Sequence, residues 1–200
     1  MRYEDLERMR DAGDIEGLLA VTEGPDDKLR HSAAEMLGEC GDVRCIGPLE
    51  KMLREGRFAY LRGAAARALG QLCAVEAVPA LIETLSDSIY YTCAGAARAL
   101  GQIGDARAVP PLIGLLRDDK EYVRWVAADA LRKFGELAVE PLLRWVREDS
   151  GRGVEMAALV LGKIGDPRAL PVLRELAETH PENYVRQTAA RAIDEIQNRD

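Results

Sequence analysis

The sequence predicts an all-α fold, an α-solenoid in which copies of one helical hairpin are stacked. An aliphatic residue ends the apolar stripe of successive amphipathic segments at intervals of 32, 31, 31, 30 and 32 residues. A Gly-Asp pair follows several of these positions, and a proline comes shortly after it. This period fits a hairpin that cannot bury both apolar faces alone and therefore needs neighbours of its own kind. The aliphatic positions are Leu37, Leu69, Leu100, Leu131, Leu161 and Ile193.

Residues 90–119 show the hairpin most clearly. Apolar residues at helical spacing up to Ile103 predict a first helix, which Gly104-Asp105 ends. The pair Pro110-Pro111 fits only the first turn of a second helix, which runs through an aliphatic segment to Asp118. The glycine supplies a left-handed residue after the first helix, and the aspartate can cap the helix that follows.

The remaining hairpins are placed by the same marks. Residues 1–25 form a degenerate N-terminal cap, in which Met9 takes the leucine position and Gly13-Asp14 the turn. Residues 182–200 form a single capping helix with a polar end. Because no Gly/Ser-rich linker or low-complexity segment interrupts the pattern, we expect residues 1–200 to form one domain. Five repeats fill the region 26–181, at 26–57, 58–88, 89–119, 120–150 and 151–181.

Composition limits the function. With 48% hydrophobic and only 5% aromatic residues, the core must consist of alanine, leucine, valine and isoleucine. A net charge of -7 disfavours a nucleic-acid binder that works through its overall field. The charged N-terminus has no secretory signal, no apolar stretch approaches membrane-spanning length, and the four cysteines show no disulfide framework. We therefore expect a cytoplasmic protein with reduced thiols.

Arginine recurs seven residues before the leucine position of four first helices, at Arg30, Arg62, Arg124 and Arg186. The other two helices have Cys93 and Val154 there, and the turn before each of them lacks the aspartate, with Ala74 and Glu136 in its place. Because the arginine and the aspartate are missing together, we predict a structural ladder of ion pairs between repeats. The arginine guanidinium could also donate hydrogen bonds to carbonyl groups of the turn. The predicted pairs are Asp14–Arg30, Asp42–Arg62, Asp105–Arg124 and Asp166–Arg186.

Aromatic side chains gather at one edge of the first helices. Four tyrosines lie nine residues before their leucine position, and Trp125 lies one helical turn beyond one of them. These positions and their variable neighbours are off the apolar stripe, so they should face outward, and their residue types are enriched at interface centres. The alternative is that the tyrosine rings only cover the seams between repeats. The predicted partner-binding residues are Tyr60, Arg67, Tyr90, Tyr91, Arg98, Tyr122, Trp125, Asp129, Met156, Tyr184 and Arg191.

No residue is predicted to be catalytic, cofactor-binding or metal-ligating. Cys40 and Cys45 have a C-x4-C spacing, but they take the positions of Ile103 and Ala108 in another repeat, so a core role is favoured over a metal or iron–sulfur site. Cys73 takes the position of a turn glycine. Of the two histidines, His31 falls on an outward position and is expected to be solvated, and His180 falls in an inter-repeat loop. No phosphate-binding loop is present.

The segments Val123-Arg124…Ala127-Ala128…Ala130-Leu131 and Ala96–Asp105 (AARALGQIGD) resemble the HEAT-like repeats related to those of phycobilisome lyases. The resemblance is close over 26–197 and weak before it. It implies a right-handed α-solenoid, an α-α superhelix of about five full hairpin repeats with degenerate terminal caps, whose outward first-helix positions line a concave recognition surface. HEAT-like di-iron hydroxylases carry repeated His-Glu pairs as ligands. Here Ser32 and Pro181 follow the two histidines, so that chemistry is not expected.

These observations favour a non-enzymatic scaffold that binds a protein or peptide partner on the concave face, without a cofactor. The alternative is an accessory or chaperone-like subunit for chromophore or cofactor attachment, resembling bilin lyase subunits. Tyr90, Tyr91, Arg98 and Trp125 could then line a tetrapyrrole groove. A nucleic-acid binder is disfavoured by charge, and the oligomeric state is open.

Overall fold

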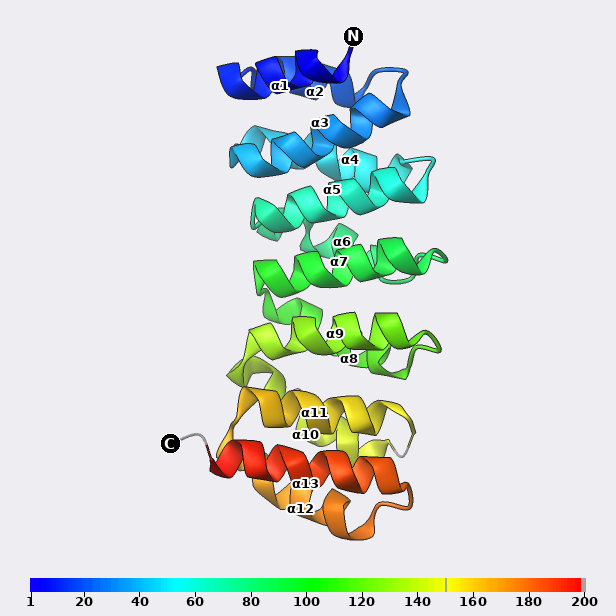
Figure 1. Cartoon of the computed structure of the whole chain (residues 1–200), viewed down its shortest axis with the longest axis vertical. Helices are drawn as coiled ribbons and strands as arrows, with labels where there is room; N and C mark the ends of the chain where they lie inside the picture. Colours follow the sequence, from blue (N-terminus) through cyan, green and yellow to red (C-terminus); the bar gives the residue numbers. More distant parts are fainter. Residues whose placement is uncertain (150, 199–200) are drawn as a thin grey trace. The chain divides into compact units, whose positions relative to one another are not determined.

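A computed structural model describes residues 1–149 and 151–198 (Figure 1). Within these ranges the chain is made of helices joined by short turns, with no strand, as the sequence predicted. The contacts divide the chain into two compact units, Met1–Asp105 and Ala106–Asp200, and each is described by itself. The expectation of a single domain stays a prediction. No described helix combines the length and the apolar character needed to cross a bilayer.

Unit 1 stacks first helices against first helices. Helix α5 packs against both α3 and α7, while the second helices α4 and α6 pack behind them (Figure 1). The elements are α1 (Tyr3–Ala12), α2 (Ile15–Thr22), α3 (Asp27–Cys40), η1 (Val43–Cys45), α4 (Ile46–Glu55), α5 (Ala59–Gln71), η2 (Val75–Ala77), α6 (Val78–Thr84) and α7 (Tyr90–Ile103).

Unit 2 repeats this arrangement. Helix α11 lies between α9 and α13, and α8 and α10 pack against each other as second helices (Figure 1). The elements are η3 (Ala106–Ala108), α8 (Val109–Gly114), η4 (Leu115–Arg117), α9 (Glu121–Phe134), α10 (Glu136–Glu148), α11 (Gly153–Ile164), η5 (Pro167–Ala169), α12 (Leu170–Thr179) and α13 (Asn183–Gln197).

The leucine positions that set the register form the core. All five leucines are completely buried, whereas Ile193 on α13 is half-buried. The glycine after the leucine lets neighbouring first helices approach closely. A Cβ built on Gly38 would lie 2.7 Å from the Cα of Ala68, and one on Gly162 would lie 2.6 Å from the Cβ of Ala192. The small side chains therefore set the helix spacing.

The turns after the first helices adopt the left-handed backbone that the Gly-Asp motif predicts. Gly41, Gly104 and Gly165 have φ of 71°, 75° and 81°. Cys73 takes the same place in its repeat with φ of 50°, and it is the one non-glycine residue with positive φ in the described part of the chain. A residue with a Cβ is strained in this conformation, so this turn carries backbone strain that the glycine turns of the other repeats avoid.

The predicted aspartate–arginine ladder is wrong in the pairing of Asp14, Asp42 and Asp166. Asp14 accepts a hydrogen bond from the backbone N–H of Gly17 at 2.9 Å, as the N-cap of α2. Asp42 and Asp166 accept from the backbone N–H groups of Arg44 and Arg168 and form ion pairs with those same side chains. Each aspartate is satisfied inside its own turn and is not available to the next first helix.

The ladder arginines instead bond carbonyls of the loop that precedes their own helix. Arg30 Nε donates to the carbonyl oxygen of Thr22 at 2.8 Å, and Arg62 Nη1 donates to that of Gly56 at 2.9 Å. Arg124 and Arg186 do the same to Asp118 and His180. Because these carbonyls end or follow a second helix, the arginines satisfy groups that the helix leaves unpaired. Asp105 and Arg124 fall in different units.

Candidate functional site

Trp125 lines two hollows on the outward face of α9, α11 and α13 in unit 2. Its side chain is 48% exposed, and its indole N–H donates to the Glu121 carboxylate at 3.3 Å, which fixes the ring on α9. The first hollow, of about 280 Å³, brings Trp125 together with two other predicted partner-binding residues, Met156 and Arg191. Leu159 and Ala192 also line it, with Glu155 and Glu195.

The second hollow, of about 240 Å³, also borders Trp125 and includes Asp129, another predicted binding residue. Ala128, Leu159 and Val160 make its wall largely apolar, while Arg132 and Lys163 reach its edge. Trp125 and Leu159 line both hollows, which we call together the Trp125 hollows, and these offer apolar surface beside charged groups. This composition suits the side chains of an extended polypeptide.

Charged groups at the rim of the Trp125 hollows are mostly paired. Asp129 contacts Arg132 at 2.9 Å and Lys133 at 3.6 Å, and Lys163 contacts Glu195 at 2.7 Å. Burial opposes ionisation of Asp129, but its hydrogen bond to Arg132 and the charges of Arg132 and Lys133 lower its pKa below the usual value. Asp129 is therefore ionised at neutral pH, and the rim has acidic and basic side chains side by side.

The side chain of Met156 is less exposed than the sequence predicted. Its side chain is only 6% exposed, so it does not face outward but forms the floor of the first hollow. The helical period placed it beside the apolar stripe. The depth of the hollow depends on the neighbouring helix α13, which a single helix's pattern does not reveal.

In unit 1, Tyr60 and Arg67 on α5 meet two side chains of α3. Arg67 Nη2 lies 2.7 Å from Glu35 Oε1 and 3.5 Å from His31 Nε2, and the His31 and Tyr60 ring centroids are 5.8 Å apart. His31 is therefore half-buried in a cluster and not simply solvated, as the sequence had suggested. The cluster combines an aromatic ring with a carboxylate and a guanidinium that are already paired.

Phe58 was missed by the sequence analysis. It is 38% exposed and stacks on Tyr60 with ring centroids 5.5 Å apart. It precedes α5 as its N-cap residue, outside the helical period used to find the other aromatics. Its position two residues before Tyr60 was the sequence feature that could have indicated a second exposed ring there.

The other predicted tyrosines also lie at the surface. Tyr90 and Tyr91 begin α7 with 44% and 57% exposure, and their rings meet edge to face with centroids 6.2 Å apart. Tyr122 and Tyr184 are 39% and 41% exposed. Half-exposed rings are compatible both with partner binding and with covering seams between helices, so both readings remain open. Arg98 is exposed on α7.

The cysteines occupy the places expected from the alignment of repeats. Cys45 and Cys93 are buried, and burial raises the pKa of Cys45 to about 11. Cys40 is half-buried and Cys73 is exposed. His180 is buried in the loop after α12, where its Nδ1 accepts from the backbone N–H of Glu182. No group of three or more His, Cys, Asp or Glu side chains within residues 1–149 and 151–198 has an arrangement that could hold a metal ion.

The family model for HEAT repeats matches residues 15–93, 46–132, 85–159 and 121–194. The chain belongs to the HEAT-repeat family. This HEAT-repeat protein is similar to the complex of CpcE and CpcF of phycocyanin lyase from a Nostoc species, with a TM-score of 0.57 and 22% identity over 95% of this chain and 85% of that one. The predicted resemblance and the solenoid fold are thereby confirmed.

A designed armadillo repeat protein in complex with the peptide (KR)4 is similar at a TM-score of 0.57 and 20% identity, over 90% of this chain and 98% of that one. Human deoxyhypusine hydroxylase in complex with glycerol is similar at a TM-score of 0.50 and 21% identity, over 98% of this chain and 90% of that one. At these identities the likeness shows the fold alone.

Two curated relatives are deoxyhypusine hydroxylases. That of Candida albicans is 34% identical over 91 residues, which is 44% of this chain and 29% of the relative. That of Eremothecium gossypii is 32% identical over 90 residues, 43% of this chain and 28% of the relative. The chain thus spans less than a third of the length of the curated relatives it matches. Because both are enzymes, the predictions of a non-enzymatic scaffold and of a chain without enzymatic activity do not stand.

The described side chains do not fit the His-Glu ligand pattern of HEAT-like di-iron hydroxylases. His31 is followed by serine and contacts Glu35 and Arg67, and His180 is buried and followed by proline.

Proposed function

We propose that this HEAT-repeat protein holds an extended segment of a protein partner across the outward face of α9, α11 and α13, with Trp125 as the central anchor. The observation that carries the proposal is the position of Trp125, which is 48% exposed and lines two hollows, one of them largely apolar and the other with both apolar and charged walls. Exposed tryptophan flanked by such hollows is typical of interface centres, where a few aromatic residues supply most of the binding energy.

The proposal applies equally to a segment held as an enzyme's substrate, the case that the hydroxylase relatives favour. One side chain of the segment would enter each Trp125 hollow, and both would contact the indole. The rim groups Glu155 and Arg191, which have opposite charge, would bond the segment's main chain. Met156 and Asp129 would then act as floor and edge of the hollows.

Two proteins of the same architecture support this proposal. The designed armadillo repeat protein is in complex with a peptide, and the two phycocyanin lyase subunits form a complex with each other. The net charge of -7 again disfavours nucleic acid as the partner. The free cysteines are in keeping with a cytoplasmic location, which stays part of the proposal.

We further propose that the exposed residues of unit 1 provide a second contact region. Tyr60 and Arg67 would act together with His31 and Glu35, to which they are already bound. The remaining members of the proposed set are Tyr90, Tyr91, Arg98, Tyr122 and Tyr184. Their contribution is expected to be smaller, because none of them lines either of the Trp125 hollows.

The test starts from a random-peptide library displayed on phage and selected on the full chain. Selected peptides are then titrated by fluorescence anisotropy against the wild type, Trp125→Ala and Tyr3→Ala. Tyr3 is 52% exposed on α1 and is the matched aromatic control. We expect Trp125→Ala to weaken binding by about tenfold or more, with an unchanged melting curve and no effect of the control. Equal binding by Trp125→Ala, or failure to select any peptide, would overturn the proposal.

A further inference from the structure

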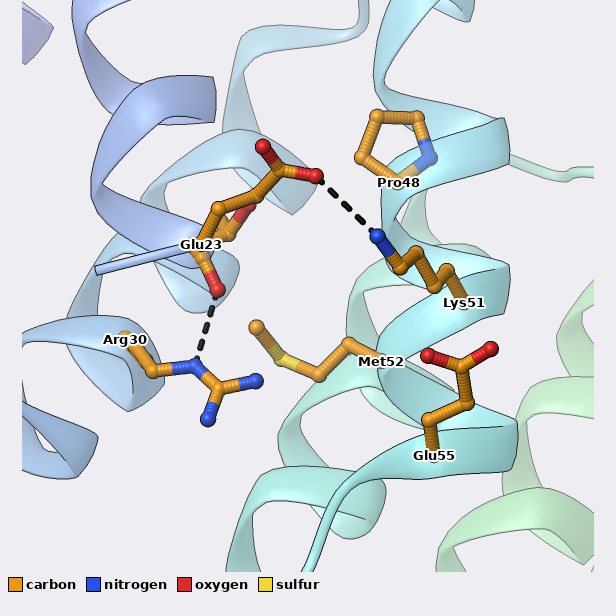
Figure 2. A pocket seen from close by; sticks show the side chains of 7 residues that line it. Glu23, Arg30, Pro48, Lys51, Met52 and Glu55 are labelled. Carbon is orange, nitrogen blue, oxygen red and sulfur yellow. Dashed lines mark hydrogen bonds and ion pairs between the residues drawn. The ribbon is translucent and has the colours of Figure 1, made fainter. Parts of the chain in front are cut away.

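A separate cavity lies in unit 1, between α2, α3 and α4. It has a volume of about 380 Å³. Arg30 borders it from α3, Glu23 from the end of α2, and Lys51, Met52 and Glu55 from α4 (Figure 2). Lys51 Nζ lies 3.3 Å from the Glu23 carboxylate, and Met52 separates Arg30 from Glu55 in Figure 2.

The next repeat has an arginine and a carboxylate at the same two positions, and there they pair. Arg62 and Asp87 are 25 residues apart, as Arg30 and Glu55 are. There the arginine and the carboxylate meet, with Nη2 2.7 Å from Oδ2, and their side chains are only 19% and 11% exposed. In the first repeat the same two positions do not pair, and the cavity takes the place of the contact.

The sequence explains why the first pair stays open. Both arginines bond a carbonyl that precedes their helix, but only Arg30 has a carboxylate one turn earlier on its own helix, with Nη1 3.0 Å from Asp27. Arg62 has Ala59 in the place of Asp27, so it is free to reach its carboxylate. Among the described residues, neither Arg30 Nη2 nor the Glu55 carboxylate has a hydrogen-bonding or ion-pair partner.

We propose that this cavity is a binding site for a small zwitterion of the amino-acid type. Its carboxylate would accept hydrogen bonds from Arg30 Nη2, and its ammonium group would donate to Glu55. Met52, which is 3% exposed, and Pro48 supply an apolar wall for the carbon atoms of the ligand.

Charge balance selects this class of ligand. The cavity is bordered by two cations, Arg30 and Lys51, and two anions, Glu23 and Glu55. A simple anion would have to lie near both carboxylates, and a simple cation near both basic groups. A ligand that carries both charges places each one beside a group of opposite sign, and such charge-assisted hydrogen bonds are the stronger ones.

The experiment titrates the ¹⁵N-labelled full chain with the free amino acids and follows amide chemical shifts around Met52. The strongest binder is then compared with its two single-charge analogues; for alanine these are propionate and ethylamine. We expect the amino acid to bind at least about tenfold more tightly than either analogue. Arg30→Gln and Glu55→Gln should each weaken binding to a similar extent.

Two controls keep the proposal falsifiable. Glu83→Gln removes a carboxylate that is 70% exposed on the following second helix and should leave binding unchanged. Trp125→Ala should also bind normally, so failure of the peptide proposal and failure of this one are separate results. The proposal is overturned if no amino acid shifts these amides, if a single-charge analogue binds as well, or if both cavity variants bind like the wild type while remaining folded.

Discussion

Arg62 and Asp87 form a partly buried ion pair although 25 residues separate them, with both Nε and Nη2 of the arginine 2.7 Å from the same carboxylate oxygen. The loop that contains Asp87 precedes α7, where Cys93 replaces the usual arginine. In unit 2, Asp149 lies before α11, where Val154 replaces it, and Asp149 pairs with Arg117. A loop whose own arginine is missing is therefore joined to an arginine from earlier in the chain.

Breaking this pair should destabilise the protein. We expect Asp87→Ala to lower the free energy of unfolding by about 1.5–3 kcal/mol, because Arg62 would keep its charge in a half-buried place without its partner. Urea unfolding followed by circular dichroism measures the loss. The control Arg44→Gln removes a guanidinium from the exposed pair with Asp42 and should cost much less. Equal losses in the two variants would show that burial does not strengthen the Arg62–Asp87 pair.

Leu100 tests the register of the repeats. Because its side chain is completely buried on α7, we expect Leu100→Ala to cost about 2–5 kcal/mol through lost contacts and a residual cavity. Val75→Ala is the matched control, since Val75 is 47% exposed and should change stability little. Thermal or urea unfolding of both variants gives the comparison. A loss of only a few tenths for Leu100→Ala would contradict its place in the core.

Cys73 offers a stabilising substitution. Its φ of 50° is unfavourable for a residue with a Cβ, and the equivalent turns have glycine. We expect Cys73→Gly to raise the free energy of unfolding by up to about 1 kcal/mol, since relief of strain is partly offset by greater freedom of the unfolded chain. Cys73→Ala keeps the strained Cβ and should bring no gain. A stability of Cys73→Gly equal to or below that of Cys73→Ala would argue against strain at this turn.

Cys45 should make stability depend on alkaline pH. Burial raises its pKa from 9.0 to about 11 in the folded chain, so the folded state favours the protonated thiol. The stabilisation is complete below pH 9 and is lost as pH rises toward and through 11, because only the unfolded thiol ionises easily in that range. Cys45→Ala should lose this part of the pH dependence. The free energy of unfolding is measured between pH 8 and 11 for the wild type and for Cys45→Ala. The same dependence of this free energy on pH in both proteins would contradict the expectation.

The proposed binding face was predictable from the sequence only in part. Trp125 and Arg191 are identified by their spacing from the leucine positions, because outward positions follow from the helical period. The hollows that Trp125 lines are not, since they depend on the side chains that α11 and α13 bring beside α9. Phe58 was missed because it lies just outside a helix, where no period applies.

The sequence by itself determined the elements that repeat: the helices, their glycine turns and the buried leucines. Each follows from a local pattern of fixed period, which the chain states several times. Only the tertiary structure decided which charges pair. Asp42 folds back onto Arg44, Arg62 reaches Asp87, and Arg30 remains apart from Glu55. Long charged side chains have several partners within reach, and the choice depends on how loops distant in sequence approach one another.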